Sequence, residues 1–563
     1  MINIIIFILS FYFCLISVLA YGNFFQRIFL AKKNINQNID VYTGFYGLMF
    51  LTLISLITSY FVQHNYYHNI ILHGLGFIYF FFSNFRNNKK FYKYIFYISI
   101  FLFSILLISK THDDFSYYHL PFTKFLTEHH VIFGMGHLNL GYNFLSSLFF
   151  LNSTFYLPLI EFYSFHFSII FFLIFFNYFL LKNIFLNKTH EFFKFFYFLT
   201  FIFFNISFNR LAEFGMDKPG QLLIVILIIK LFEIIIITEQ KKKLDQILLL
   251  LPLFGLCISI KTYFLTYLLL SFSIFLLNKK FLENLKFIFF SRSFFFFILI
   301  LVSIFSHHFI STGCIISPLP YLCFEDHFSW ARSIDDVRGL SIWLEQWSKA
   351  GAGPNFRVND VLSYIKDFNW VSNWYKKYFI IKFLDQIGIL LLSIFLILLF
   401  FKKFTTSNNK IFFKKEFLIF YFFIIGIFYV WFTHHPTLRY GGYSIFYLLI
   451  AFPTSIIFYK LKNKNDYIKK FKFFIIFIFL IINIKNFNRI KNEIDREDIY
   501  SFKDFPFFSV HKKNFTKKKY ETGLTVYSAH HCWATPSPCG NISDFNNLRL
   551  HKKKGYNFIK KNK

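Results

Sequence analysis

The chain has 563 residues, of which 56% are hydrophobic, 24% aromatic and only 16% charged. A soluble protein of this length carries about a quarter charged residues, and a disordered one is poor in apolar residues. The composition excludes both classes and indicates a protein that crosses a membrane several times. The net charge of +31 lies in clusters between apolar runs, so we expect a lipid bilayer as partner and no nucleic acid.

Apolar segments long enough to span a bilayer follow one another along the chain. A shorter stretch, Leu138–Leu151, is interrupted by polar residues, which predicts an interfacial or re-entrant segment. The predicted spans are residues 2–21, 41–62, 69–84, 93–109, 157–181, 191–208, 220–238, 246–260, 262–278, 293–310, 384–401, 416–433, 441–459 and 472–486.

Lysine and arginine in the short loops predict the orientation. Basic loops at residues 27–33, 86–90, 182–188, 241–243, 279–292, 402–415 and 460–470 all fall on one side of the predicted spans. The positive-inside rule makes that side cytoplasmic. We therefore predict a multi-pass protein of the bacterial cytoplasmic membrane whose functional face is extracytoplasmic. The segments assigned to that face are residues 64–68, 111–156, 209–220, 311–382, 433–442 and the tail from 487.

The alternation of apolar spans and polar loops predicts an all-α polytopic membrane protein. It also divides the chain into five parts: N-terminal transmembrane helices (1–92), a transmembrane core with an acidic outer loop (93–310), a large extracytoplasmic loop (311–383), C-terminal transmembrane helices (384–486) and a small Lys-rich extracytoplasmic tail (487–563).

The cysteines agree with this orientation. Cys314 and Cys323 share the large outer loop, and Cys532 and Cys539 share the tail. Close pairs on an oxidising side favour two local disulfides, and neither pair has the CxxC spacing typical of a metal site.

The first polar patch of the outer side is Thr111–His119. Its adjacent carboxylates, Asp113 and Asp114, lie near His119. They could hold a divalent metal such as Mg²⁺ or Mn²⁺. Alternatively, one of them acts as a general base on an acceptor hydroxyl, or Asp114 only caps an amphipathic helix over Tyr117–His130.

Two further patches carry cations that could bind an anionic substrate. Asp217 and Lys218 lie in a short outer connection, and Lys261 lies between two apolar runs, where a charge is costly unless it is paired, binds an anion or snorkels. Arg439 follows a span, and its planar fork suits a phosphate. The neighbouring His434 and His435 could add acid–base function, although all of these residues could simply be solvated or interfacial.

The large outer loop holds Trp330, Trp343, Trp347, Trp370 and Trp374, five of the seven Trp residues. Indole rings can stack on sugar faces, but a Trp belt at the membrane interface is an equal alternative. The sequence has no Walker A loop, GxGxxG or HExxH motif, which disfavours nucleotide-driven transport and zinc proteolysis.

The order of an acidic pair (Asp113–Asp114) after a span, followed by Tyr117–His130 and Leu138–Leu151, resembles the GT-C superfamily of integral-membrane glycosyltransferases, which includes protein O-mannosyltransferases and aminoarabinose transferases. The segments Thr312–Pro318 and Cys532–Cys539 resemble those of an uncharacterised bacterial membrane-protein family of cell-surface polysaccharide function. The GT-C resemblance implies a helical bundle, a polyprenyl-phosphate sugar donor and an acidic catalytic residue. This chain departs from the simplest pattern by having about three spans before the one that leads into the acidic loop.

These observations predict a glycosyltransferase that moves a sugar from a polyprenyl-phosphate donor to a lipid, glycan or protein acceptor. Asp113 or Asp114 would be the base or metal ligand, and Arg439, with Lys218 or Lys261, would neutralise the leaving phosphate. Two alternatives stay open: an O-antigen polymerase or ligase, whose essential residues would lie in the large outer loop, and a lipid-linked oligosaccharide flippase or other transporter.

Overall fold

Two apolar helices, α7 (Phe167–Phe185) and α9 (Asp217–Ile237), form the centre of the molecule. Their apolar segments are 94% and 83% buried, whereas those of α17 (Leu384–Phe400) and α18 (Lys415–His434) are only 28% buried. A helix that is apolar all round belongs in an interior. The outer helices expose apolar side chains such as Leu392 and Phe422, as helices facing lipid do.

The computed structural model describes residues 2–30, 39–83, 88–108, 114–185, 189–208, 216–237, 240–277, 285–353, 357–400, 415–459, 467–494, 500–501, 507–508, 510 and 514–561. The remaining helices are α1 (Ile2–Phe25), α2 (Thr43–Thr58), α3 (Tyr66–Phe82), α4 (Lys89–Leu102), α5 (Leu120–Glu128), α6 (Ser147–Ser153), α8 (Glu191–Ser207), α10 (Gln240–Ile260), α11 (Leu270–Leu277), α12 (Leu285–Phe289), α13 (Arg292–Thr312), α14 (Ile334–Lys349), α15 (Val361–Ile365), α16 (Val371–Trp374), α17 (Leu384–Phe400), α18 (Lys415–His434), α19 (Tyr443–Tyr459) and α20 (Tyr467–Glu493).

The chain is a multi-pass membrane protein. Within the described residues, nine helices are long and apolar enough to cross a bilayer. The other predicted spans also form helices, but α2, α3, α8 and α19 have only 16 or 17 residues. The span predicted at 262–278 is divided into a 3-10 helix, Thr262–Leu269, and α11.

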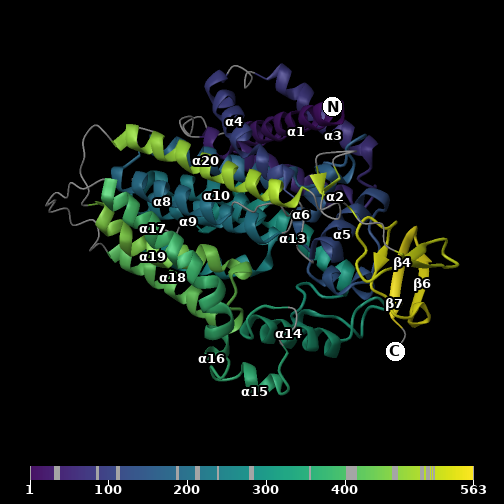
Figure 1. Cartoon of the computed structure of the whole chain (residues 1–563). Coiled ribbons are helices and arrows are strands. Elements are labelled where there is room, and N and C mark those ends of the chain that lie inside the picture. The colour runs from purple at the N-terminus through teal and green to yellow at the C-terminus, as the bar shows by residue number, and fades with distance from the viewer. Residues whose placement is uncertain are drawn as a thin grey trace.

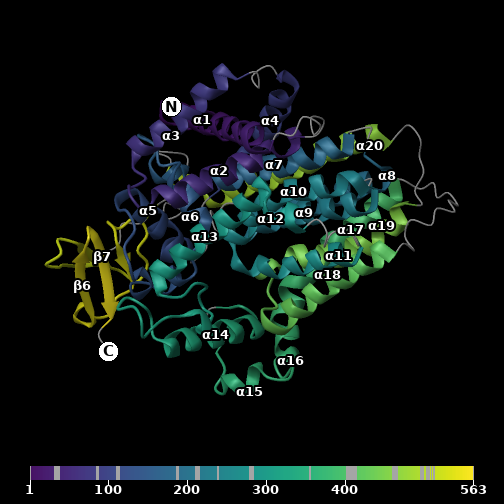
Figure 2. The ribbon, with the colours of Figure 1, turned by 180° about the vertical axis from the view of Figure 1, so that it is seen from behind.

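The long helices run side by side, and the segments beyond their ends separate into two groups (Figures 1 and 2). At one end, which we call the basic end, the Lys470 ammonium donates to the Phe400 carbonyl and the Arg292 guanidinium to the Ile28 carbonyl, both within 3.0 Å. These contacts join helix ends that adjoin predicted cytoplasmic loops. At the opposite end, the site end, lie α14 to α16 and the C-terminal strands.

The large loop is mostly helical. Ser333 caps α14 by accepting from the Asp336 amide, and acidic residues fill the first turn, as the helix dipole favours. α16 continues through a π-helical stretch, Tyr375–Phe383, into α17, so this helix begins before the predicted span. Near the start of the loop, Cys314 and Cys323 form a disulfide with an S–S distance of 2.06 Å.

The segment after the acidic pair differs in its bounds from the amphipathic helix predicted over Tyr117–His130. It forms a π-helical turn, Phe115–His119, followed by α5, whose residues are buried except for Lys124 and Glu128 at its edge. α6 is a short helix buried among α2, α5, α7 and α10. Both elements therefore belong to the packed interior of the site end.

The C-terminal tail corrects the expectation of an all-helical chain, because it forms β-structure. In one sheet β4 is central, antiparallel to β3 and parallel to β5, and β6 and β7 form a hairpin. The Cys532–Cys539 disulfide, with an S–S distance of 2.09 Å, joins the loop after β4 to the first residue of β5. The strands are β1 (Tyr500–Ser501), β2 (Phe507–Phe508), β3 (Thr516–Lys519), β4 (Thr525–Ser528), β5 (Cys539–Gly540), β6 (Leu548–Lys553) and β7 (Tyr556–Lys561).

Candidate functional site

Arg439 lies in a π-helical turn, Leu438–Gly442, that connects α18 to α19. Gly441 has a φ of +85°, a conformation that glycine adopts without strain. The Leu438 amide donates to the Tyr378 hydroxyl at 2.8 Å, and the Leu438 carbonyl accepts from the Gln221 amide at 3.0 Å. These bonds hold the backbone next to Arg439 in place, so its side chain extends from a fixed base.

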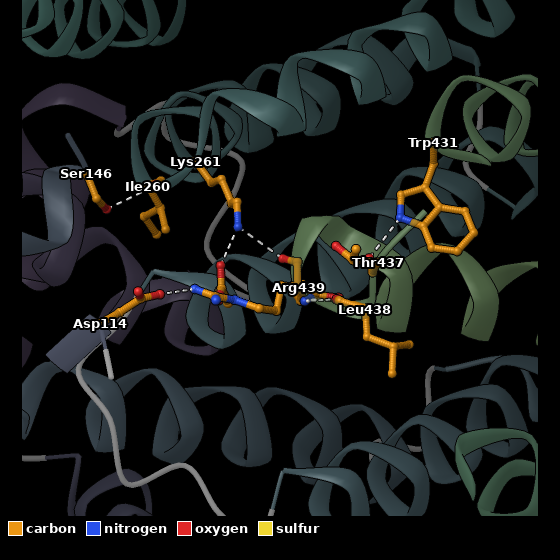
Figure 3. Close-up of polar contacts among 10 residues, drawn as sticks. Asp114, Ser146, Ile260, Lys261, Trp431, Thr437, Leu438 and Arg439 are labelled. Carbon is orange, nitrogen blue, oxygen red and sulfur yellow. Dashed lines mark hydrogen bonds and ion pairs between the residues drawn. The ribbon is translucent and has the colours of Figure 1, made fainter. Parts of the chain in front are cut away.

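The guanidinium of Arg439 bridges two carboxylates. Its Nε donates to Asp217 Oδ2 at 2.8 Å and its Nη2 to Asp114 Oδ2 at 2.5 Å. The Lys261 ammonium binds the other oxygen of Asp217 and donates to the Arg439 carbonyl at 3.1 Å (Figure 3). Four ionised groups from four separate segments thus form one connected ion-pair network.

Lys261 is positioned by a break in the helix. α10 ends at Ile260, whose carbonyl accepts from the Ser146 hydroxyl at 2.7 Å, and Lys261 is extended before the next helical turn begins (Figure 3). Its ammonium lies 4.2 Å from the centre of the Tyr440 ring, a favourable cation–π distance. The lysine side chain therefore points inward and binds Asp217. It does not extend toward the membrane surface, as a snorkelling lysine would.

The network is largely removed from solvent. The exposed fraction of the side chain is 10% for Lys261, 21% for Asp217, 25% for Asp114 and 32% for Arg439. Burial lowers the pKa of Lys261, although Asp217 opposes that shift. Burial also opposes the charge of Arg439, but the two carboxylates outweigh it and raise the pKa of the guanidinium. Two carboxylates and two cations balance formally, so the network holds no net charge.

A cavity of about 870 Å³ opens beside this network, and all four ionised residues line it. Its volume falls within the usual range for ligand sites. The indoles of Trp343 and Trp347 on α14 form part of the wall, and the Arg439 guanidinium lies 5.9 Å from the centre of the Trp347 ring. Arg357, stacked over Trp343 at 5.7 Å, adds a third cation to the lining. The cavity thus combines aromatic surfaces with five charged groups, three of them cationic.

The two predicted histidines of the third patch also line the cavity. His434 is exposed, and its Nδ1 lies 2.9 Å from the Thr433 hydroxyl. His435 is partly buried, with its Nδ1 3.3 Å from the Ser348 hydroxyl. Burial, together with nearby positive groups, lowers the pKa of His435 to about 4. His435 is therefore neutral near pH 7 and available as a hydrogen-bonding group.

Two other predicted site residues lie elsewhere. His119 is buried against Phe149, with 5.4 Å between the ring centres, and does not line the cavity. The Lys218 ammonium lies 6.0 Å from the centre of the Phe208 ring, and Lys218 is likewise absent from the cavity wall. Asp113, the other predicted carboxylate, lies outside the described residues.

The described residues offer little for a divalent metal. Among them, no group of three or more histidine, cysteine or acidic side chains is arranged to hold one. Asp114 and Asp217 each bind a cationic side chain instead. The site for Mg²⁺ or Mn²⁺ considered from the sequence also includes Asp113, which lies outside the described residues, so it stays a prediction.

Sequence reasoning missed the contribution of the C-terminal tail, since His530 and Asn541 line the same cavity. A usable signal existed: each residue lies two positions outside a cysteine of the Cys532–Cys539 pair, so a disulfide would bring them close together. The tail's sequence shows no feature that points to the membrane core, and only the fold reveals the contact.

No curated protein and no solved structure matches this chain. A family model described as "Domain of unknown function (DUF8201)" matches residues 4–446, a region that contains the whole ion-pair network and ends before the C-terminal tail. Because the match covers most of the chain, the protein belongs to the DUF8201 family.

Proposed function

We propose that this protein is a membrane glycosyltransferase that moves a sugar from a polyprenyl-phosphate donor to an acceptor hydroxyl at the extracytoplasmic face. The observation that carries the proposal is the Asp114–Arg439–Asp217–Lys261 network on the wall of the large cavity. Such a reaction requires a base for the acceptor, cations for a leaving phosphate and a surface for sugar rings. The cavity wall offers a candidate for each: the Asp114 carboxylate, the cations Arg439 and Lys261, and the indoles of Trp343 and Trp347.

In this reaction the acceptor oxygen forms a bond to the anomeric carbon, while the bond from that carbon to the phosphate oxygen breaks and its electron pair goes to the phosphate. Asp114 accepts the proton of the acceptor hydroxyl. Arg439 and Lys261 stabilise the charge that develops on the phosphate, and cations held in place before the reaction are the most effective.

The resting network explains how Asp114 would be kept inactive before the donor binds. A carboxylate paired with a guanidinium is a weak base, because the positive charge favours its ionised form. A donor phosphate competes for Arg439, and a shift of the guanidinium toward the phosphate would weaken its bond to Asp114. The basicity of Asp114 would then rise when a donor is present to react.

The position of the network supports an enzyme over a transporter. Ionisable groups that carry a substrate across a membrane line a path near its midplane. Here Asp217 and Lys261 lie where apolar helices begin or end, at the site end. Further along α9, Lys230 binds Glu233 at 2.9 Å, so these two charges satisfy each other.

The test uses the full-length protein in lipid nanodiscs with polyprenyl phosphates that carry radiolabelled sugars, and acceptors supplied as alkyl glycosides and membrane glycolipids. We expect the wild type to release polyprenyl phosphate and transfer label, and Asp114→Asn to lose both. Asp335→Asn changes a carboxylate on α14 whose side chain is 90% exposed; it is the matched control and should retain activity.

Two results would contradict the proposal. Transfer by Asp114→Asn at the wild-type rate would remove the proposed base. The protein could instead polymerise lipid-linked repeats in a way that requires the large loop but not Asp114. That result would favour the O-antigen polymerase.

A further inference from the structure

We propose that His530 and Asn541, which we call the tail pair, bind the hydroxyl groups of a sugar in the acceptor, so that the acceptor of this enzyme is a glycan. This inference rests on the proposed function, since it assigns the second substrate of the same cavity. The tail pair comes from the C-terminal β-structure, whereas the ion-pair network comes from the helical bundle. The two substrates would therefore be recognised by different parts of the chain.

Strand geometry places the two residues side by side. β4 and β5 are parallel neighbours in which Ser528 pairs with Gly540, and the Ala529 amide donates to the Gly540 carbonyl at 3.0 Å. His530 and Asn541 follow directly, so both leave the carboxyl edge of the same two strands. Both are exposed to solvent and both line the cavity.

The loop between them is tied to the segment that carries Asp114. The Trp533 amide donates to the Ser116 carbonyl at 3.0 Å, and the Ser116 hydroxyl lies 2.8 Å from His531 Nδ1. The Tyr142 hydroxyl donates to the Cys539 carbonyl at 2.6 Å. With the disulfide at its base, this loop is a fixed part of the site end.

The tail also packs closely against the helical part of the chain next to Asn541. The Asn541 amide donates to the Leu138 carbonyl at 2.9 Å, and a Cβ added to Gly540 would lie only 2.2 Å from the same carbonyl oxygen. Asn541 lines the cavity together with Tyr117, which lies three residues after Asp114. Because the backbone bond is independent of the side chain, Asn541 can be changed without releasing the loop.

The chemistry of the tail pair suits a sugar. Imidazole and carboxamide groups each donate and accept hydrogen bonds, which matches neighbouring hydroxyls on a sugar ring. Trp343 and Trp347 on α14 offer apolar surfaces to the same cavity, and sugars combine polar edges with apolar faces. A simple lipid alcohol has a single hydroxyl and would leave most of these groups without a partner.

The first experiment measures binding without turnover. Ser341→Cys places a thiol on α14 in the cavity lining, and the free cysteines Cys14 and Cys257 are buried. A charged methanethiosulfonate reagent labels the new thiol in nanodiscs, with methyl glucoside, methyl galactoside or methyl mannoside as the probe. We expect at least one glycoside to slow labelling.

In that background, His530→Ala and Asn541→Ala should each raise the half-protecting sugar concentration about tenfold, the effect of losing one hydrogen bond. His530→Gln, which keeps a donor and an acceptor, should restore protection. The matched controls are His551→Ala and Asn546→Ala, two exposed tail residues outside the cavity lining. In these controls the glycoside should protect the thiol as well as it does in the Ser341→Cys protein. Lack of protection by every glycoside, or equal protection in all variants, would overturn the proposal.

A second readout separates this inference from the proposed function. With alkyl glycoside acceptors, the tail-pair variants should raise the KM for the acceptor while the KM for the polyprenyl-phosphate donor is unchanged. Sugar transfer with an unchanged acceptor KM would refute the tail pair and leave the enzyme proposal intact. Sugar protection that depends on the tail pair, without any transfer, would refute the enzyme proposal and retain the sugar site.

Discussion

Arg439 connects two carboxylates that are remote in the sequence: Asp217, 222 residues earlier, and Asp114, 325 residues earlier. The three residues come from separate parts of the site end: Asp217 begins α9, Asp114 precedes the π-helical turn Phe115–His119, and Arg439 lies between α18 and α19. The guanidinium uses Nε for one carboxylate and Nη2 for the other, so the bridge depends on its planar fork as well as its charge.

Arg439→Lys should therefore fail even though it keeps the charge. An ammonium is a single donor centre on a flexible stem and cannot reproduce both contacts. We expect sugar transfer to fall by about 10²-fold, the usual loss when one stabilising donor is removed. The measurement is kcat with saturating polyprenyl-phosphate donor. Arg338→Lys, an exposed residue on α14, is the control, and equal rates for both variants would show that only charge is needed.

Asp114→Asn tests the proposed base. The amide keeps the shape of the side chain and can still contact neighbouring groups, but it does not accept a proton usefully. We expect kcat to fall by about 10²-fold or more, with little change in the amount of folded protein. If Asp114 served only as a helix cap, asparagine would replace it with nearly full activity.

Lys261→Met tests the network as a structural unit. It leaves Asp217 with Arg439 as its remaining cation, and we expect a loss of about 1–3 kcal/mol in the free energy of unfolding, since charged hydrogen bonds contribute on that scale. The double variant Lys261→Met/Asp217→Asn restores the charge balance, so it should be more stable than the sum of the single changes predicts. Thermal and denaturant unfolding in detergent measure both effects. Simple additivity would mean that the two residues do not interact.

His435 should make the stability of the protein depend on pH. Burial lowers its pKa from 6.5 to about 4, so between these values the unfolded chain binds more protons than the folded one. Stability is therefore fully present above about pH 6.5 and falls as the pH decreases toward 4. His435→Gln should make this decline shallower, as measured by melting temperature against pH. An unchanged dependence of the melting temperature on pH would show that the pKa of His435 is not lowered in the folded protein.

The sequence identified the members of the network but not their contacts. Asp217, Lys261 and Arg439 attract attention because they interrupt or border apolar runs, and alternating spans place them on one side. Their pairing depends on how helices far apart in sequence pack together, which periodicity does not reveal. For the same reason His119 and Lys218 looked equivalent to their neighbours, although their side chains contact the apolar rings of Phe149 and Phe208.

The tail shows a different limit. Its strands have between two and six residues and many lysines, so the alternation that marks a half-buried strand is nearly absent. Only the cysteine pair indicated a local fold. The loop of this sheet docks on the segment around Ser116 and Leu138, and such contacts depend on the tertiary structure.

Reporter fusions can test the orientation of the chain in the membrane, and the structure predicts which segments must share a side. The ion-pair network and the C-terminal tail share one cavity, so they must lie on the same side of the membrane. The Arg292–Ile28 and Lys470–Phe400 contacts join helix ends at the other end of the bundle.

We expect a periplasmic reporter such as alkaline phosphatase to be active when it is fused after the C-terminus and inactive after Lys243. A cytoplasmic reporter such as green fluorescent protein should give the reverse pattern. If the signals of both fusions were exchanged, the cavity would face the cytoplasm, and the proposed polyprenyl-phosphate donor, presented at the extracytoplasmic face, would have no access to Arg439.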